Sequence, residues 1–150
     1  MNDTTTHDAT VSDAARSLRS LDQHGPALHH VASALTADAG LAAKLVVRAV
    51  LACRHDDVDP GLRELSSLVV LGWLGRPSQL PTDTVPLPSL LQDVHALPDD
   101  QRALLALCRF GAHTYRDAAR VLTLSADGAA VLLCTALRTL QAPEVVPLTA

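Results

Sequence analysis

The chain has 150 residues, of which 48% are hydrophobic and 2% aromatic, and its formal net charge is −4. This length fits one domain of ordinary size or two small ones, and the core must be built from Leu, Val and Ala. There is no run of basic residues, and Lys44 is the single lysine. Proteins that bind nucleic acid normally carry a basic surplus or a basic face, so the composition counts against DNA binding.

The three cysteines are widely spaced and form no C-x-x-C pair; they are Cys53, Cys108 and Cys134. This pattern predicts a reducing compartment and buried thiols rather than a disulfide framework. The polar, acidic N-terminus lacks the apolar segment of a signal peptide, and no apolar run reaches the length of a membrane span. We therefore expect a cytoplasmic protein without a membrane segment.

The first half of the chain predicts three helices after a flexible tail over residues 1–12. Apolar residues recur at helical intervals from Asp13 to about Cys53, with a break at residues 36–40 and with Pro26 in a first helical turn. A turn cluster follows at residues 55–61, and a third apolar stretch extends from about Leu62 to Leu74. Alternating β-branched and aromatic runs are nearly absent, so the predicted fold class is all-α.

The second half begins with a proline-rich linker. Residues 76–89 hold four of the nine prolines, and we assign 76–96 to the linker, with one or two helical turns over 89–95. A helix begins near Pro98, with two acids in its first turn. Thr114 and Ser125 are N-cap candidates for helices over 115–122 and 126–140, a helix-turn-helix spacing, and 143–150 form a tail.

At this point the sequence resembles a known family. Residues 97–140, LPDDQRALLALCRFGAHTYRDAARVLTLSADGAAVLLCTALRTL, align without a gap with the −35-binding region 4 of extracytoplasmic-function sigma factors of bacterial RNA polymerase. That family's pattern is approximately LPxxQRxxLxLRxxxGxSYxEIAxxLGISxGTVKSRLxRALxxL. The matching positions are Leu97, Pro98, Gln101, Arg102, Leu105, Leu107, Tyr115, Ala119, Leu122, Ser125, Ala136, Leu137 and Leu140.

The N-terminal half resembles region 2 of the same family more weakly, through LDQHGPALHH and the Asp59-Pro60 step followed by Arg63. The resemblance implies two small helical lobes joined by the proline-rich linker. The first lobe, residues 13–75, would grasp RNA polymerase and the −10 element. The second, residues 97–142, would read the −35 element with its helix-turn-helix.

The DNA-contacting chemistry of the family is missing from the second lobe. Where the family pattern has T-V-K-S-R and a further basic residue, this chain has Gly128, Ala129, Ala130, Val131, Leu132 and Thr135. Each lost phosphate contact removes counterion release, and base readout needs long polar side chains. Asp127 would repel a phosphate at the helix N-terminus. We expect DNA binding to be weak or absent; alternatively, Arg116, Arg120 and Arg138 suffice for weak binding.

The polymerase-contacting positions implied by the resemblance are also altered. By alignment, the family's acidic and amide residues become Lys44, Val47 and Arg48, which inverts the charge of the expected contact. The positions that build the lobes are retained. Leu133, Leu137 and Leu140 are expected to face the lobe core, as are Tyr115, Ala119 and Leu122.

Apolar residues lie at or beside the positions where the family pattern has polar or charged residues. Val131 and Leu132 lie beside the predicted core stripe, and Val46, Val47, Val50 and Leu51 make a wide apolar stripe in the first lobe. Exposed apolar patches indicate a protein partner or self-association, which makes Val47, Val131 and Leu132 candidates for a protein-contact surface. The alternative is that these residues only pack one lobe on the other.

No other pattern in the sequence indicates catalysis. The seven histidines follow no ligand spacing with the cysteines, the acids at 56–59 lack an EF-hand pattern, and no nucleophile elbow or phosphate loop occurs. We expect no enzyme activity, no metal and no cofactor.

The sequence leaves three hypotheses for the function. The first is a sigma-like transcription regulator acting through contact with an anti-sigma factor, RNA polymerase or another regulator. The alternatives are a working sigma factor that directs polymerase to promoters, and a non-catalytic helical scaffold that forms homo-oligomers.

Overall fold

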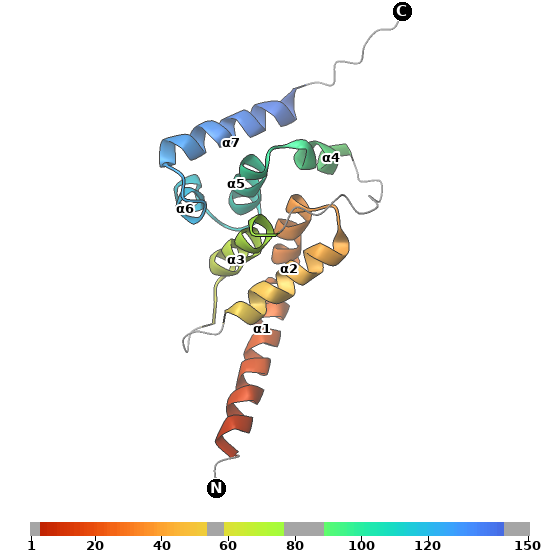
Figure 1. The fold of residues 1–150 in the computed structure, drawn as a ribbon, viewed down its shortest axis with the longest axis vertical. Helices are drawn as coiled ribbons and strands as arrows, with labels where there is room; N and C mark the ends of the chain where they lie inside the picture. The colour runs from red at the N-terminus through yellow and green to blue at the C-terminus, as the bar shows by residue number, and fades with distance from the viewer. Residues whose placement is uncertain (1–3, 54–58, 77–88, 143–150) are drawn as a thin grey trace, which may run out of the picture.

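The computed structural model of the chain describes residues 4–53, 59–76 and 89–142. These ranges hold seven helices and no strand (Figure 1), which confirms the all-α prediction. The helices are α1 Thr4–Leu35, α2 Ala39–Ala52, α3 Leu62–Leu74, α4 Ser89–Ala96, α5 Asp99–Arg109, α6 Tyr115–Val121 and α7 Ala126–Gln141. The predicted tail over 143–150 and most of the predicted linker lie outside the described residues.

The longest helix, α1, differs from the prediction at both of its unusual points. It begins at Thr4, so most of the predicted tail over 1–12 is helical; the segment contains no Gly or Pro and extends the helix that is packed further along. Pro26 lies inside α1 rather than in a first turn. Proline leaves the carbonyl of residue 22 without a helical donor, and Asp22 is exposed, so water can satisfy that carbonyl.

The next two helices begin and end close to where the sequence predicts. Residues 36–38 separate α1 from α2, a shorter break than the predicted 36–40. The Asp38 carboxylate caps α2 by accepting a hydrogen bond from the Leu41 N–H at 3.0 Å. Helix α3 spans Leu62–Leu74, the predicted third apolar stretch. Together α1, α2 and α3 pack as a three-helix unit, which we call the first half.

The second half, α4 to α7, also follows the capping signals in the sequence. Helix α5 begins after Pro98 with Asp99 and Asp100 in its first turn. Thr114 and Ser125 are the N-caps of α6 and α7, as predicted; their hydroxyl oxygens accept hydrogen bonds from the N–H groups three residues further on. The chain bends by 110° between α6 and α7.

One hydrophobic core extends through both halves, so the two predicted lobes do not have separate cores. Helix α5 packs on α1 and α3 as well as on α6 and α7, and lies between the two groups (Figure 1). Leu104 and Leu107 of α5 are fully buried, as are Leu28 of α1 and Val69 of α3. The short helix α4, predicted as part of the linker, packs on α1. The halves therefore form a single body.

Arg102 on α5 forms hydrogen bonds with the carbonyl groups of three residues near the boundary between the halves, and we call this its fastening role. Its guanidinium donates hydrogen bonds to the carbonyl oxygens of Leu35 at 2.9 Å, His95 at 2.7 Å and Leu97 at 2.9 Å. Leu35 ends α1 and His95 lies in the last turn of α4, where carbonyls have no helical partner. Burial lowers the pKa of Arg102, yet arginine stays protonated at any physiological pH.

Two further contacts support this fastening. The ring of Trp73, which is fully buried at the end of α3, has the guanidinium carbon of Arg76 at 4.1 Å from its centre and that of Arg102 at 5.2 Å. The His95 Nε2 atom lies 2.8 Å from the Ser33 carbonyl oxygen, so Nε2 carries the proton and joins α4 to α1.

We expect Arg102→Met to destabilise the protein by about 2–4 kcal/mol, because three carbonyl oxygens lose a charged donor in a place that water reaches poorly. The free energy of unfolding in urea measures the loss. Arg138→Met on the exposed face of α7 is the matched control and should change stability by no more than about 0.5 kcal/mol. Equal losses in the two variants would contradict the fastening role of Arg102.

Candidate protein-contact surfaces and the junction between the halves

The predicted contact positions on α7 do not form one exposed row. Gly128 and Ala130 are half-buried, and the Gly128 N–H donates to the Ser125 hydroxyl oxygen at 3.0 Å. Leu132 is half-buried and packs against the core, so it is only partly available to a partner. Thr135 is exposed. Among the family's DNA-contact positions, Val131 and Thr135 are therefore the exposed ones.

The buried face of α7 is built from alanines more than from the predicted leucines. Ala129 and Ala136 are fully buried, whereas Leu137 is 45% exposed, so the predicted orientation of Leu137 is wrong. The prediction that Ala129 faces outward is wrong as well. Leu133 and Leu140 are half-buried at the edge of the core. The small alanines let α7 approach α5 and α6 closely, which decides the face that is buried.

The outward side of α7, which we call the α7 outer face, consists of Asp127, Val131, Thr135 and Arg138. Val131 is 65% exposed. The Thr135 hydroxyl donates to the Val131 carbonyl oxygen at 2.8 Å, so its proton is used within the helix. Over the first two turns this face offers one acid, one apolar side chain and one occupied hydroxyl. It has none of the long side chains, Arg, Lys, Asn or Gln, that make bidentate contacts with base edges there.

Two of the three arginines proposed to allow weak DNA binding, Arg116 and Arg120, contact neighbouring side chains. The Arg120 guanidinium contacts the Asp117 carboxylate at 3.1 Å, and the hydroxyl of Thr114 is the main cause that lowers the pKa of Asp117. The Arg116 Nε–H donates to the Tyr115 hydroxyl oxygen at 3.1 Å. Tyr115 is 36% exposed, so its predicted place in the core is wrong, because its ring lies beside Arg116 at the surface.

The apolar stripe predicted on α2 divides between two sides of the helix. Val46 and Val50 are each 6% exposed and belong to the core. Val47 and Leu51 are 49% and 47% exposed. The two remaining candidates, Lys44 and Arg48, are exposed too. Successive helical residues are about 100° apart, so 44, 47, 48 and 51 share one side, which we call the α2 outer face.

This face is cationic and apolar at once. No ion pair involves Lys44 or Arg48 among the residues that the structure describes. A shallow hollow of about 350 Å³ lies beside Leu41, Lys44 and Val47. A second hollow, of about 460 Å³, lies between α1 and the end of α2 and is lined by Leu18, Leu51 and other residues. Residues of the α2 outer face therefore line both surface depressions.

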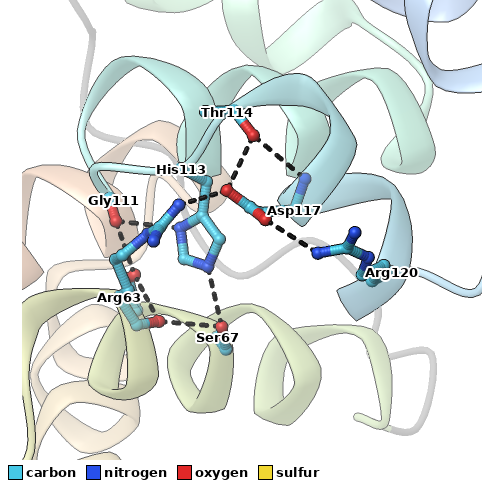
Figure 2. Close-up of polar contacts among 8 residues, drawn as sticks. Arg63, Ser67, Gly111, His113, Thr114, Asp117 and Arg120 are labelled. Carbon is cyan, nitrogen blue, oxygen red and sulfur yellow. Dashed lines mark hydrogen bonds and ion pairs between the residues drawn. The ribbon is translucent and has the colours of Figure 1, made fainter. Parts of the chain in front are cut away.

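A cluster of polar contacts, which we call the junction, joins α3 to α6 and the segment before it (Figure 2). Arg63 forms an ion pair with Asp117, and the Ser67 hydroxyl oxygen lies 3.0 Å from His113 Nε2. Deeper in the boundary, the buried Ser66 hydroxyl donates to the Gly111 carbonyl oxygen at 3.1 Å. These contacts connect residues 45 to 54 positions apart in the chain.

The contacts of His113 fix its protons. Nδ1 lies 2.8 Å from the Gly111 carbonyl oxygen, which can only accept, so Nδ1 is protonated. In the neutral ring Nε2 then accepts from the Ser67 hydroxyl. That hydroxyl also lies 2.8 Å from the Arg63 carbonyl oxygen and has one proton for two acceptors. Protonation of His113 would satisfy both, but burial, aided by Arg63, lowers its pKa.

Two of the three cysteines are half-buried thiols. Burial, with help from Glu64, raises the pKa of Cys53 to about 11, and burial also raises the pKa of Cys108, so both thiols are protonated at neutral pH. Cys134 is exposed on α7, and the prediction that it is buried is wrong because it lies on the solvent side of the helix. In the ranges with described coordinates, no group of His, Cys, Asp and Glu could hold a metal ion.

Sequence reasoning missed the junction altogether. His113 and His95 show no ligand spacing in the sequence, and both make hydrogen bonds between the two halves. One feature of the sequence pointed to His113: it lies between Gly111 and the N-cap Thr114, in a turn too short to carry its side chain away from the packed helices. Its partner Ser67 could not be recognised without the packing of α3.

Comparisons with known proteins do not extend the resemblance: no family model, no curated protein and no solved structure matches the chain. No single helix in the described ranges is long and apolar enough to cross a membrane. The pair α6 and α7 reaches that length and hydropathy only when taken together across its bend.

We expect Gly111→Ala to force the junction apart. A Cβ atom there would lie 2.8 Å from the Ser66 hydroxyl oxygen and 2.9 Å from the Leu107 carbonyl oxygen, closer than contact distance. The expected loss in free energy of unfolding is about 1–3 kcal/mol. Gly72→Ala is the control, since its Cβ would meet Leu45 at an ordinary 3.5 Å inside α3 and should stabilise by up to about 1 kcal/mol. Stabilisation by both substitutions would refute the close approach at Gly111.

The junction should also weaken in mild acid. The pKa of His113 is lower in the folded protein than in the unfolded chain, so the unfolded chain binds more protons between the two values. The contribution of His113 is therefore complete above about pH 6.5 and is lost as the pH falls through its folded pKa. Urea midpoints at pH 7.5 and 5.5 should differ less in His113→Gln than in the wild type. The control is His29→Gln at an exposed position, whose midpoints should change with pH as those of the wild type do. If the urea midpoint falls by the same amount in His113→Gln as in the wild type, His113 is not the cause.

Proposed function

We propose that the chain is a sigma-factor-like transcription regulator that acts through protein contact and does not read promoters. The observation that carries the proposal is the α7 outer face. A side chain at Val131 that is 65% exposed stands between Asp127 and an internally bonded Thr135. A helix placed in the major groove needs cations for phosphates and long polar groups for bases. This face supplies neither over its first two turns.

The bend between α6 and α7 supports a helix-turn-helix origin for this pair. The angle of 110° and the four-residue connection lie within the range typical of that motif. Such a motif is a scaffold, and its function depends on the side chains that it presents. Here those side chains favour a protein surface over DNA.

The α2 outer face supports the same proposal from the other half. The resemblance places an acidic contact with RNA polymerase at these positions, and the exposed residues here are Lys44 and Arg48 instead. A basic partner surface would meet like charge. The partner class is therefore an anti-sigma factor, another regulator, or a site on polymerase that differs from the one implied by the resemblance.

The packing between the halves bears on the alternative, a working sigma factor. Reading two promoter elements with two lobes requires the lobes to take up the spacing that the DNA sets. The shared core and the hydrogen bonds of Arg102 favour one closed arrangement instead. Opening it would expose Leu104 and Leu107, at a cost of about 1.5–3 kcal/mol for each large apolar side chain.

Fluorescence anisotropy with labelled promoter DNA at low salt tests the proposal. We expect no sequence-selective binding below the micromolar range for the wild type. The double variant Ala130→Lys and Thr135→Arg adds two cations to α7 and should bind the promoter DNA at 50 mM salt at least tenfold more tightly than the wild type. It should also steepen the dependence of log K on log salt by about 1.8, the value for two phosphate contacts.

The control variant adds the same charge elsewhere. Ala15→Lys with Gln23→Arg places two cations on exposed positions of α1, and its gain in DNA affinity should be smaller. Sub-micromolar, sequence-selective binding by the wild type would refute the proposed function. Equal gains in the two variants would show that α7 is not oriented as a former recognition helix.

A further inference from the structure

We infer that the α2 outer face is the docking site for an amphipathic helix of a partner protein, one whose apolar stripe is flanked by Asp or Glu. The inference rests on the proposed function, which assigns the chain to protein contact, and names the chemistry of the partner at one of its surfaces. Lys44, Val47, Arg48 and Leu51 recur at i, i+3, i+4 and i+7 on one exposed side of α2. This spacing presents a ridge about 10 Å long.

The apolar part of this ridge continues onto α1. Leu51 is 47% exposed and lines the 460 Å³ hollow together with Leu18, which is 63% exposed. Pro60, which is buried, lines the same hollow. Apolar side chains of a docked helix at i, i+3 or i+4 and i+7 fit a surface of this length, with one anchor beside Val47 and another in the hollow.

The charge on this surface is unbalanced, and that selects the partner. Helix α2 contains Lys44 and Arg48 and no acidic residue from Ala39 to Ala52. Asp13, which lines the hollow, pairs with Arg16 at 3.8 Å, and Asp59, next to the lining Pro60, pairs with Arg16 at 4.0 Å and with Arg19 at 3.5 Å. The two free cations are one helical turn apart. Carboxylates one turn apart on a partner helix would pair with both, which neutral or basic helices cannot do.

Two other occupants fit the surface less well. Anionic lipid gains about 1 kcal/mol per cation near the membrane, and two free cations on a chain of net charge −4 give little attraction. A second copy could offer the exposed stripe Val11, Leu18 and Leu21 of α1. That stripe is flanked by Asp13, Arg16, Arg19 and Asp22, whose charges cancel and so do not complement Lys44 and Arg48.

Selection from a displayed peptide library tests the inference on the full chain. The library is a helical scaffold with a fixed Leu stripe and flanking positions randomised among Glu, Lys, Gln and Ala. We expect the wild type to enrich Glu at pairs of flanking positions one turn apart. The tightest-binding peptide is then synthesised, and its affinity is measured by anisotropy. It should bind the double variant Lys44→Glu and Arg48→Glu at least tenfold more weakly than it binds the wild type. The double variant Val47→Ser and Leu51→Ser should lose at least as much affinity.

The matched control reverses two exposed arginines on the other half, Arg116→Glu with Arg138→Glu, and should bind the peptide within twofold of the wild type. Far-UV circular dichroism and urea unfolding confirm that each variant is folded. The charge-reversed α2 variant should in turn enrich Lys in the same library, a result that a purely structural defect would not give.

Several outcomes would overturn the inference. They are enrichment of Lys or of no charge by the wild type, peptide binding that survives the α2 reversal, or no selected peptide at all. Sedimentation with phosphatidylserine vesicles that depends on Lys44 and Arg48 would assign the face to lipid instead. A dimer in light scattering that the α2 reversal dissolves would assign it to a second copy. Selective promoter binding refutes the proposed function in a separate assay, so the two failures are distinguishable.

Discussion

The three hydrogen bonds of Arg102 are the constraint on which the arrangement of the helices depends. Carbonyl groups at a helix end are left without partners, and at the boundary between the halves water has poor access to them. A single guanidinium on α5 satisfies carbonyls at the end of α1, in the last turn of α4 and at Leu97. It also lies over the buried ring of Trp73 on α3. Moving the halves apart would break the bond to the Leu35 carbonyl and the contact with Trp73 at the same time as it exposed the apolar core, so the halves close together.

This constraint changes the meaning of the family resemblance. Of the positions that carry it, Leu97, Leu107 and Ala119 are buried, and Arg102 is the fastening residue of the boundary. A match at such positions follows from what helix packing requires and says little about activity. Of the α7 positions that would carry the family's activity, Val131 and Thr135 lie on the α7 outer face, and both differ from the family pattern. The proposed function therefore rests on what the exposed side chains can do.

Local features of the fold could be predicted from the sequence, and features that depend on neighbours could not. The caps at Thr114 and Ser125 and the bounds of α3 follow from signals within a few residues. The orientation of α7 could not be predicted in this way. The helix has a stripe of leucines beside a stripe of alanines, and its packing on α5 and α6 decides which of the two is buried. The same holds for His113, whose partner lies 46 residues earlier. Exposure of the candidate site residues was left open by the sequence: the structure exposes Lys44, Val47, Arg48, Val131 and Thr135, whereas Gly128 and Ala130 are half-buried and Leu132 packs at the edge of the core.

The α7 outer face and the α2 outer face differ in the apolar area and the charge that they present to a partner. The α7 outer face has one exposed apolar side chain, Val131, and one charge of each sign, Asp127 and Arg138, so it offers little apolar area and no net charge. The α2 outer face combines exposed apolar area with two cations that form no ion pair with any described residue. Charge complementarity rejects wrong partners and speeds encounter with the right one. Apolar area alone gives affinity for many surfaces. Specific recognition should therefore begin at α2, with the valine on α7 adding contact area only for a partner large enough to reach around the body.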